Sequence, residues 1–247
     1  MNKKFNTKLL VIILTLLAAV FAVSVFTVLA EEPEVTEVRT WEELLNAVNA
    51  DKTHIKLMNP IEDITPDDEL PTKHRLVFDG GVDYVLDLNG YNLEVINRIN
   101  EFYTGDFSMI EVSKSSKLEI RDGSLVFENY YAKSNRKAMG TVAVKDDASL
   151  VARNVDMKNK YTGTVVYASG NANVILEGGE YVVMNGFALY MENTASLTLD
   201  SGIYVHTLMG DSVFTASVDG YGALYSDSKG ELVINNAFFK SGVQVSP

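Results

Sequence analysis

The chain has 247 residues, with 33 acidic and 21 basic side chains and a net charge of −12 at neutral pH. Hydrophobic residues make up 47% of the sequence and charged residues 22%, a mixture typical of a globular chain with a buried core. The sequence contains no cysteine, which excludes disulfide-rich scaffolds and thiolate-bound zinc or iron–sulfur sites. The acidic balance also argues against nucleic acid as a partner, because phosphate binding requires clustered lysine and arginine.

Residues 1–30 have the three-part pattern of a secretory signal peptide. A basic start is followed by an almost wholly apolar run over 9–28, and small residues precede a cleavage site that we place after Ala30. An uncleaved membrane anchor is the alternative, because the apolar run is long enough to span a bilayer. Loss of the three lysines in this segment leaves 18 basic and 33 acidic residues, a net charge of −15. The sequence thus predicts a bacterial protein that is secreted or surface-exposed and, once cleaved, has no membrane span.

One short helix is predicted before a strand-rich region. Residues 31–39 are acidic and lack a clear period, which predicts a flexible linker. Thr40 and Glu43 form the pattern of a capping box. An apolar stripe at helical spacing follows and predicts a helix over 41–50 that caps the N-terminal end of the fold; its members are Trp41, Leu44, Leu45 and Val48. Trp41, the single tryptophan, is expected to be a packing anchor.

The rest of the chain repeats itself. Five segments begin at 109, 141, 165, 188 and 223, and in each the first core residue of the second strand lies nine positions later. The steps between segments are 32, 24, 23 and 35, so the base period is about 23 residues with two longer insertions. Apolar residues alternate within each segment, which is the pattern of a strand with one buried face.

Three sets of apolar residues recur at matching positions and are predicted to point inward. The first is Ile110/Val112, Val142/Val144, Val166/Ala168, Leu189/Met191 and Leu224; the second is Leu118/Ile120, Leu150/Ala152, Val174/Leu176, Leu197/Leu199 and Leu232/Ile234; the third is Leu125, Met157, Tyr181, Tyr204 and Phe239. A turn is predicted between the second and third sets, at Asp122, Asn154, Gly178, Ser201 and Asn236.

Three short strands per period of about 23 residues, each beside its copy in the next period, predict a parallel β-helix. A β-sandwich is the rival fold, but a sandwich would not keep a nine-residue register over five repeats. The layout resembles the pectate-lyase-like right-handed β-helix superfamily, through the coil motif of residues 186–202 and the earlier segment 85–90. We therefore expect one all-β solenoid domain over 40–247, with less regular coils over 53–100 and regular coils over 105–245.

Irregular segments interrupt this solenoid. Loops are predicted over 63–73, 97–107, 129–138 and 207–220, where they could project and carry function. The last coil has no evident cap, so its strand edges are open to association. Three arrangements are open for it: residues 241–247 fold over it, it self-associates with another copy, or the chain belongs to a longer protein.

The resemblance raises the question of catalysis, because polysaccharide lyases of this superfamily place Ca²⁺-binding acids and a basic arginine on one sheet. The arginine–proline segment that accompanies such a site does not occur in this sequence. The remaining catalytic candidates are Glu111, Arg121, Asp122 and Arg153, which fall on two adjacent coils. A surface ladder of paired charges is the competing explanation and is favoured. The pair Asp146 and Asp147 is expected to be a solvated turn.

A column of outward-facing tyrosines is the stronger ligand-binding candidate. Tyr167, Tyr190 and Tyr225 occupy the same outward position in three successive coils. Such a row could stack against sugar rings, and the flanking Ser169, Glu192 and Asp227 could bond hydroxyls or a Ca²⁺ ion. The alternatives are aromatic self-stacking that stabilises the sheet, or cover by the insertion over 207–220.

Three functions remain open on the sequence. The first is an exported, non-catalytic β-helix module at the cell surface that recognises a polysaccharide or a surface partner. The second is a polysaccharide lyase or glycoside hydrolase, and the third is a structural spacer or adhesin segment. We expect no cofactor other than a possible Ca²⁺ ion, and no dedicated metal site is predicted.

Overall fold

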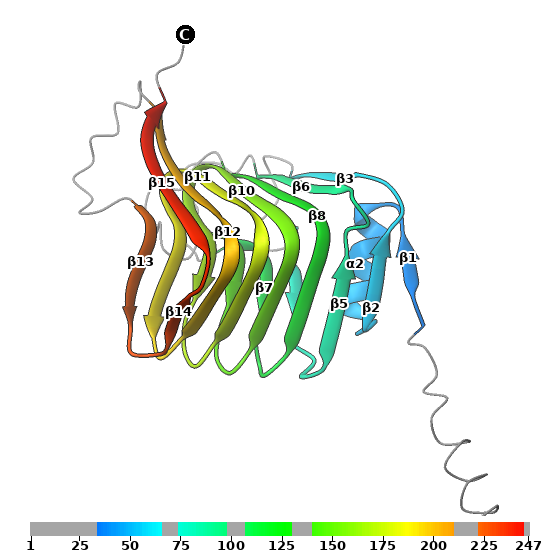
Figure 1. Ribbon diagram of the computed structural model, residues 1–247. Coiled ribbons are helices and arrows are strands. Elements are labelled where there is room, and N and C mark those ends of the chain that lie inside the picture. The colour runs from blue at the N-terminus through cyan, green and yellow to red at the C-terminus, as the bar shows by residue number, and fades with distance from the viewer. Residues whose placement is uncertain (1–33, 66–73, 98–106, 130–139, 210–221, 245–247) are drawn as a thin grey trace, which may run out of the picture. The chain divides into compact units, whose positions relative to one another are not determined.

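The computed structural model describes residues 34–65, 74–97, 107–129, 140–209 and 222–244 (Figure 1). The predicted signal peptide lies outside these residues, as does most of each predicted loop. Residues 35–247 form one compact unit. The strands follow one another along this unit as stacked turns of chain, from β1 and β2 near the N-terminal end to β13, β14 and β15 at the other end (Figure 1).

The described residues form one helix and fifteen strands. In chain order these are β1 (Thr36–Val38), α2 (Trp41–Asn49), β2 (His54–Leu57), β3 (Ile61–Thr65), β4 (Leu76–Phe78), β5 (Asp83–Asp87), β6 (Asn92–Asn97), β7 (Ser108–Val112), β8 (Lys117–Asn129), β9 (Gly140–Val144), β10 (Ser149–Ala168), β11 (Asn173–Asn193), β12 (Ser196–Met209), β13 (Gly222–Ser228), β14 (Leu232–Ile234) and β15 (Ala237–Gln244).

Every strand pairing among the described residues is parallel, and the pairings form three ladders. We call them the first ladder (β4, β7, β9, β13 and the ends of β10 and β11), the second ladder (β1, β2, β5, β14 and the starts of β8, β10, β11 and β12) and the third ladder (β3, β6, β15, the middle parts of β10 and β11, and the ends of β8 and β12). The longest strands belong to more than one ladder, because each continues through a bend of the coil and pairs with neighbouring coils on both sides of that bend. The protein is therefore all-β and parallel, of the solenoid class, and the sandwich alternative is wrong because its sheets are antiparallel.

The register follows the repeat that the sequence predicts. Leu150 pairs with Leu118 on one side and with Val174 on the other, and Leu197 pairs with Leu232. Each of these residues is the first core residue of its second strand. The longer steps in sequence therefore add residues outside the ladders without changing which residues face each other.

The predicted inward residues form one continuous core. In every coil before the last, none of the residues in the three predicted sets is more than 2% exposed. The last coil differs: Leu232, Ile234 and Phe239 are 42%, 45% and 38% exposed. Their side chains lack a following coil among the described residues, so the prediction of burial is wrong at this end.

Three of the five predicted turn residues between the second and third ladders have left-handed backbone, whereas Ser201 and Asn236 do not. Asp122, Asn154 and Gly178 have φ values of 54°, 53° and 84°, in the left-handed region that short polar residues and glycine tolerate. At the next position, Gly179, a Cβ would lie 2.0 Å from the Val155 carbonyl oxygen. Glycine is required there because the neighbouring coil approaches the backbone directly.

Helix α2 packs at the N-terminal end of the solenoid core. The Thr40 side chain caps it by accepting from the Glu43 N–H at 3.2 Å. Leu44, Ala47 and Val48 are buried in the core cluster, and Trp41 packs against it as a partly buried anchor. The helix ends at Asn49, one residue before the predicted end.

Two segments expected to be irregular are strands. Residues 36–38 of the predicted flexible linker form β1, because they pair with β2 and bury Val38 against the core. Residues 63–65 of the first predicted loop continue β3, where they pair with the last residues of β6. In both places tertiary pairing overrides a polar local sequence. Residues 207–209 likewise belong to β12 and not to the following loop.

Candidate functional site

The tyrosine column lies on the first ladder as the sequence predicts. Tyr167 pairs in register with Tyr190, and Tyr190 pairs with Tyr225. The rings of Tyr167 and Tyr190 stack with centroids 6.0 Å apart, and those of Tyr190 and Tyr225 stack at 4.6 Å with 18° between their planes. We call these three residues the tyrosine ladder. The in-register stacking follows from the parallel pairing, which puts identical side chains directly above one another.

Phe187 completes this aromatic group. Its ring centroid lies 5.4 Å from that of Tyr190 and 5.3 Å from that of Tyr225. Sequence reasoning missed this contact, because strict alternation places residues 187 and 190 on opposite sides of a strand. Phe187 follows Gly186, whose φ of 152° marks a change in backbone direction at this point.

The tyrosine ladder is not the open platform that we expected. Tyr167 and Tyr190 are only 8% and 2% exposed, and they form a buried cluster with Ala143. Tyr190 lies between the rings of Tyr167 and Tyr225, and Tyr167 lies between Tyr190 and Ala143, so neither ring is free to stack on a sugar. Tyr225, at the end of the ladder, is 39% exposed. Aromatic self-stacking, the alternative weighed against sugar binding, therefore describes the inner rungs.

The flanking polar residues also share one line. Glu192 pairs in register with Asp227, and Ser169 lies one position beyond the Ala168–Met191 pair. The Tyr167 hydroxyl donates to the Glu192 carboxylate at 2.5 Å, which ties that carboxylate to the buried ring. Asp227 is exposed, and Ser169 is half-buried. In the described part of the chain no group of three or more His, Asp or Glu residues is placed to hold a metal ion, and Ca²⁺ binding stays a prediction.

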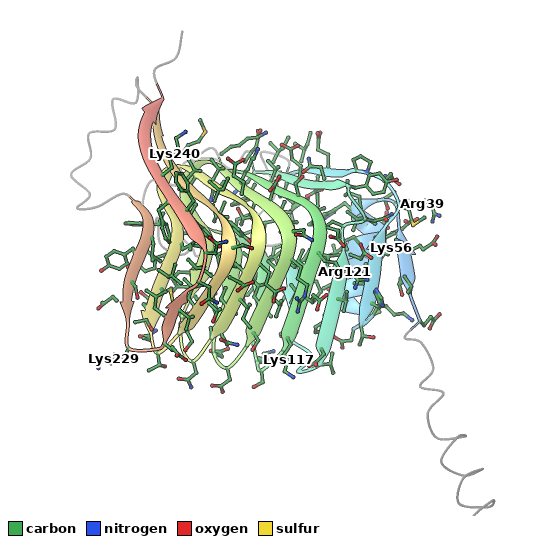
Figure 2. The ribbon with its side chains drawn as sticks, viewed as in Figure 1. Arg39, Lys56, Lys117, Arg121, Lys229 and Lys240 are labelled. Atoms are coloured by element: carbon green, nitrogen blue, oxygen red, sulfur yellow. The ribbon has the colours of Figure 1, made fainter. Side chains whose placement is uncertain are left out.

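Arg121 and Arg153, from the catalytic candidates, are brought together on the second ladder, where they pair in register. Arg121, which is labelled in Figure 2, lies on the second ladder. Its guanidinium group bonds Asp87 at 3.1 Å and lies 3.8 Å from Glu119. Arg153 lies 3.6 Å from Glu119 and forms an ion pair with Glu177. Arg121 also donates to the His54 ring, with 3.3 Å between its Nη2 and the His54 Nε2 atom. Both guanidinium groups are thus already engaged by protein partners.

Glu111 does not belong to that cluster. It lies on β7 in the first ladder, where its carboxylate accepts from Arg75 at 3.2 Å and from Lys145 at 3.0 Å. Asp122 occupies a left-handed turn and faces the Asn154 side-chain amide at 3.5 Å. The expected grouping of the four candidates is therefore wrong for Glu111, because residues 111 and 121 face different sides of one coil. The ladder of paired charges describes Arg121 and Arg153, while Asp122 lies in the neighbouring turn beside an amide.

The structure adds acids that sequence reasoning missed. Asp87, Glu119 and Glu177 are the carboxylates that pair with Arg121 and Arg153 on the second ladder of strands, and we call these five residues the charge ladder. The available signal was that Asp87 and Glu177 are in register with Arg121 and Arg153, and that Glu119 lies two residues before Arg121 on the same side of β8. Asp146 and Asp147 are exposed in a turn, and the Asp147 carboxylate accepts from the Asn171 side chain at 2.8 Å.

The tyrosines whose pKa values are raised lie outside both groups of candidate residues. Burial, together with a 2.6 Å hydrogen bond to Asp51, raises the pKa of Tyr84 to about 12. Burial raises the pKa of Tyr181 well above its ordinary value, and burial also raises the pKa of Tyr204. The rings of Tyr181 and Tyr204 stack in the core at 4.9 Å. These shifts reflect a dry interior and do not mark a reactive group.

Comparison with known proteins gives no further identification: no family model, no curated protein and no solved structure matches the chain. No helix within the described ranges is long and apolar enough to cross a membrane. The assignment of a function therefore depends on the geometry of the candidate residues.

Proposed function

We propose that this chain is exported and acts outside the bacterial cytoplasm as a non-catalytic binding module for a polysaccharide or a surface partner. We infer that its solenoid is a right-handed β-helix with three strands and about 23 residues per coil, capped by α2. The signal-peptide pattern of residues 1–30 supports export. The pattern of the pectate-lyase-like superfamily supports the handedness, and one fold of this kind hosts many activities.

The exposed ring of Tyr225 is the observation that carries the binding proposal. One face of the ring stacks on Tyr190, which holds the ring in one orientation before any ligand arrives. Phe187 packs beside it, and Asp227 lies two residues further along the same strand, so it shares the outward side. A rigid aromatic face next to an exposed carboxylate suits a sugar ring, whose apolar face can stack while its hydroxyls donate to the acid.

The electrostatics of the charge ladder favour binding over catalysis. A lyase needs a basic group that is free to take a proton from the substrate. Arg121 and Arg153 instead each contact two carboxylates, and Glu111 is held between Arg75 and Lys145. Paired charges of this kind suit the outer surface of stacked coils, where they relieve repulsion between like residues.

The test is a polysaccharide panel, read with and without added Ca²⁺, on the chain from residue 31 onward and on two variants. Tyr225→Ala removes the ring, and Tyr225→Phe is the matched control that keeps the ring and loses only the hydroxyl. We expect Tyr225→Ala to weaken binding by about fivefold to tenfold, the size of one aromatic contact, while Tyr225→Phe binds like the parent.

Two results would contradict the proposal. If polysaccharide binding persists unchanged in Tyr225→Ala, the exposed ring is not the contact site. If no polysaccharide binds, the polysaccharide is ruled out as the ligand and the surface partner is the form of the proposal that is left. Products are measured in the same samples, and bond cleavage that is lost in Arg121→Ala would replace the binding module with the lyase or hydrolase alternative.

A further inference from the structure

The last coil presents unpaired strand edges. Among the described residues β13 pairs only with β11, while β14 and β15 pair only with β12. On the β14 edge, the Leu197 N–H donates to the Glu231 carbonyl and the Asn235 N–H donates to the Leu199 carbonyl, each at 2.9 Å. Successive residues of a strand direct their backbone groups to opposite sides. The backbone groups of Leu232 and Ile234 therefore point away from β12, toward the open side.

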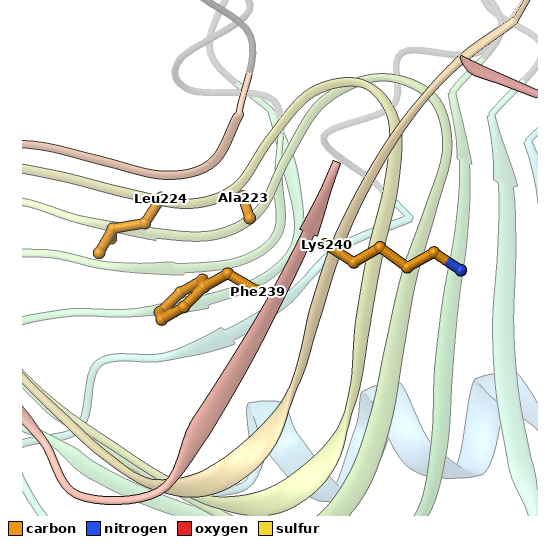
Figure 3. Close-up of a pocket in the computed structure, with 4 residues that line it drawn as sticks. All are labelled: Ala223, Leu224, Phe239 and Lys240. Atoms are coloured by element: carbon orange, nitrogen blue, oxygen red, sulfur yellow. The ribbon is translucent and has the colours of Figure 1, made fainter. Parts of the chain in front are cut away.

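The apolar interior of the coil opens at the same level. Leu232 and Ile234 are 42% and 45% exposed, whereas their register partners in the preceding coil, Leu197 and Leu199, are 2% and 0% exposed. A cavity of about 330 Å³ lies between β13 and β15 and is lined by Ala223, Leu224, Phe239 and Lys240. Leu224 and Phe239 point into this space from the two strands, and the Lys240 side chain points away from it (Figure 3).

The two ends of the solenoid are different. At the N-terminal end, helix α2 buries Leu44, Ala47 and Val48 in the core cluster. Its outer side carries exposed Glu42 and Glu43. Strands β1, β3 and β4 each have a single strand partner among the described residues, but α2 packs against all three of them. An open coil arriving at this end would therefore meet a helix with a charged outer side and not an open core. Head-to-tail stacking into a filament is thus disfavoured, and an open coil is matched only by another open coil.

The charges of the last coil are suited to contact with a copy of itself. Residues 223–240 contain two acids, Asp227 and Glu231, and two bases, Lys229 and Lys240. The chain as a whole carries 33 acidic and 21 basic residues. The open end is therefore a neutral surface on a strongly acidic protein, and repulsion between copies is lowest where two such ends meet.

We propose that two copies of this chain associate end to end through their last coils, around a two-fold axis that lies perpendicular to the solenoid axis. A second copy is the partner because its own last coil has strand edges in the same arrangement. The two-fold operation reverses the strand direction, so strands pair antiparallel across the contact and the two apolar openings close on each other. The result is a closed dimer in which the last coil of each copy is buried in the interface.

The experiment measures the mass of the chain from residue 31 onward by light scattering after size-exclusion chromatography, over a range of concentrations. This version retains residues 35–247, the whole compact unit. We expect twice the mass of one chain. Ile234→Lys puts a charge on the open edge, and the two-fold axis brings two such charges together, so the dimer dissociation constant should rise about a hundredfold. Thr198→Lys adds the same charge on the outer surface of the preceding coil and should leave the dimer intact.

Other outcomes overturn the proposal. A monomer at every soluble concentration shows that copies do not meet, and slow hydrogen exchange of residues 232–239 in that monomer would show that the chain covers its own end. Filaments would contradict the closed two-fold contact, and a dimer that Ile234→Lys leaves intact must use another surface. The partly exposed Tyr225 lies on β13, in this same last coil, so a bound glycan should compete with pairing. The mass measurement is made without glycan, which keeps it independent of the binding proposal.

Discussion

The inward column of the second ladder can be tested by truncating two of its leucines. Leu197 is 2% exposed and lies between Val174 and Leu232 in adjacent coils. Leu197→Ala removes most of a fully buried side chain and leaves a cavity, for which measured costs are about 2–5 kcal/mol. We expect a loss of about 3 kcal/mol in the free energy of unfolding, because the neighbouring last coil can relax partly into the space. Leu232→Ala is the matched control: its side chain is 42% exposed, so the loss should be about 1 kcal/mol.

The assay is urea unfolding at a concentration below that of dimer formation. Far-ultraviolet circular dichroism follows the strands, and the fluorescence of Trp41, the single tryptophan, follows the opposite end of the solenoid. Coincident transitions permit a single free energy, whereas separated ones report that the last coils unfold first. A cost near zero for Leu197→Ala would refute the inward assignment. A larger cost for Leu232→Ala than for Leu197→Ala would refute the open last coil.

Two further predictions concern buried tyrosines. The Tyr181 hydroxyl is buried without a hydrogen-bond partner among the described residues. Tyr181→Phe should therefore leave the free energy of unfolding unchanged or raise it by about 1 kcal/mol. Tyr204→Phe loses a 3.2 Å bond to the Ser201 carbonyl and should lower it by about 1 kcal/mol; the opposite order of the two variants would contradict this account. The Tyr84 pKa is raised from 10.0 to about 12, so the folded state retains a proton that the unfolded state releases; this contribution is fully present below pH 10 and is lost as the pH rises toward 12. Urea midpoints measured over this range should fall more steeply for the parent than for Tyr84→Phe, and parallel curves would show that Tyr84 does not contribute.

Much of the fold was predictable because strand periodicity and repeat spacing act together. The nine-residue interval within each segment assigned Leu118, Leu150, Val174 and Leu197 to one column, and the structure pairs them in that order. The capping pattern of Thr40 likewise predicted the start of α2. Strand β1 was not predictable in this way, because residues 36–38 are polar in character and become a strand only by pairing with β2.

The candidate sites were less predictable, since they depend on what surrounds an outward side chain. Alternation alone indicated that Tyr167, Tyr190 and Tyr225 share a column, but it carried no information on which ring faces are occupied. Stacking at the coil spacing buries the first two rings and leaves the third exposed. Sequence proximity also grouped Glu111 with Arg121, although a corner of the coil separates their ladders.

By itself, the sequence determined the direction of each strand residue, the step from coil to coil and the parallel class of the fold, because these follow from a period of two and a repeat of about 23 residues. Only the tertiary structure decided which charges pair, which tyrosine is exposed and that the inward residues of the last described coil are partly exposed. Those properties depend on the presence or absence of a neighbouring coil. A neighbour lies 23 to 35 residues away along the chain and about 4.8 Å away in space.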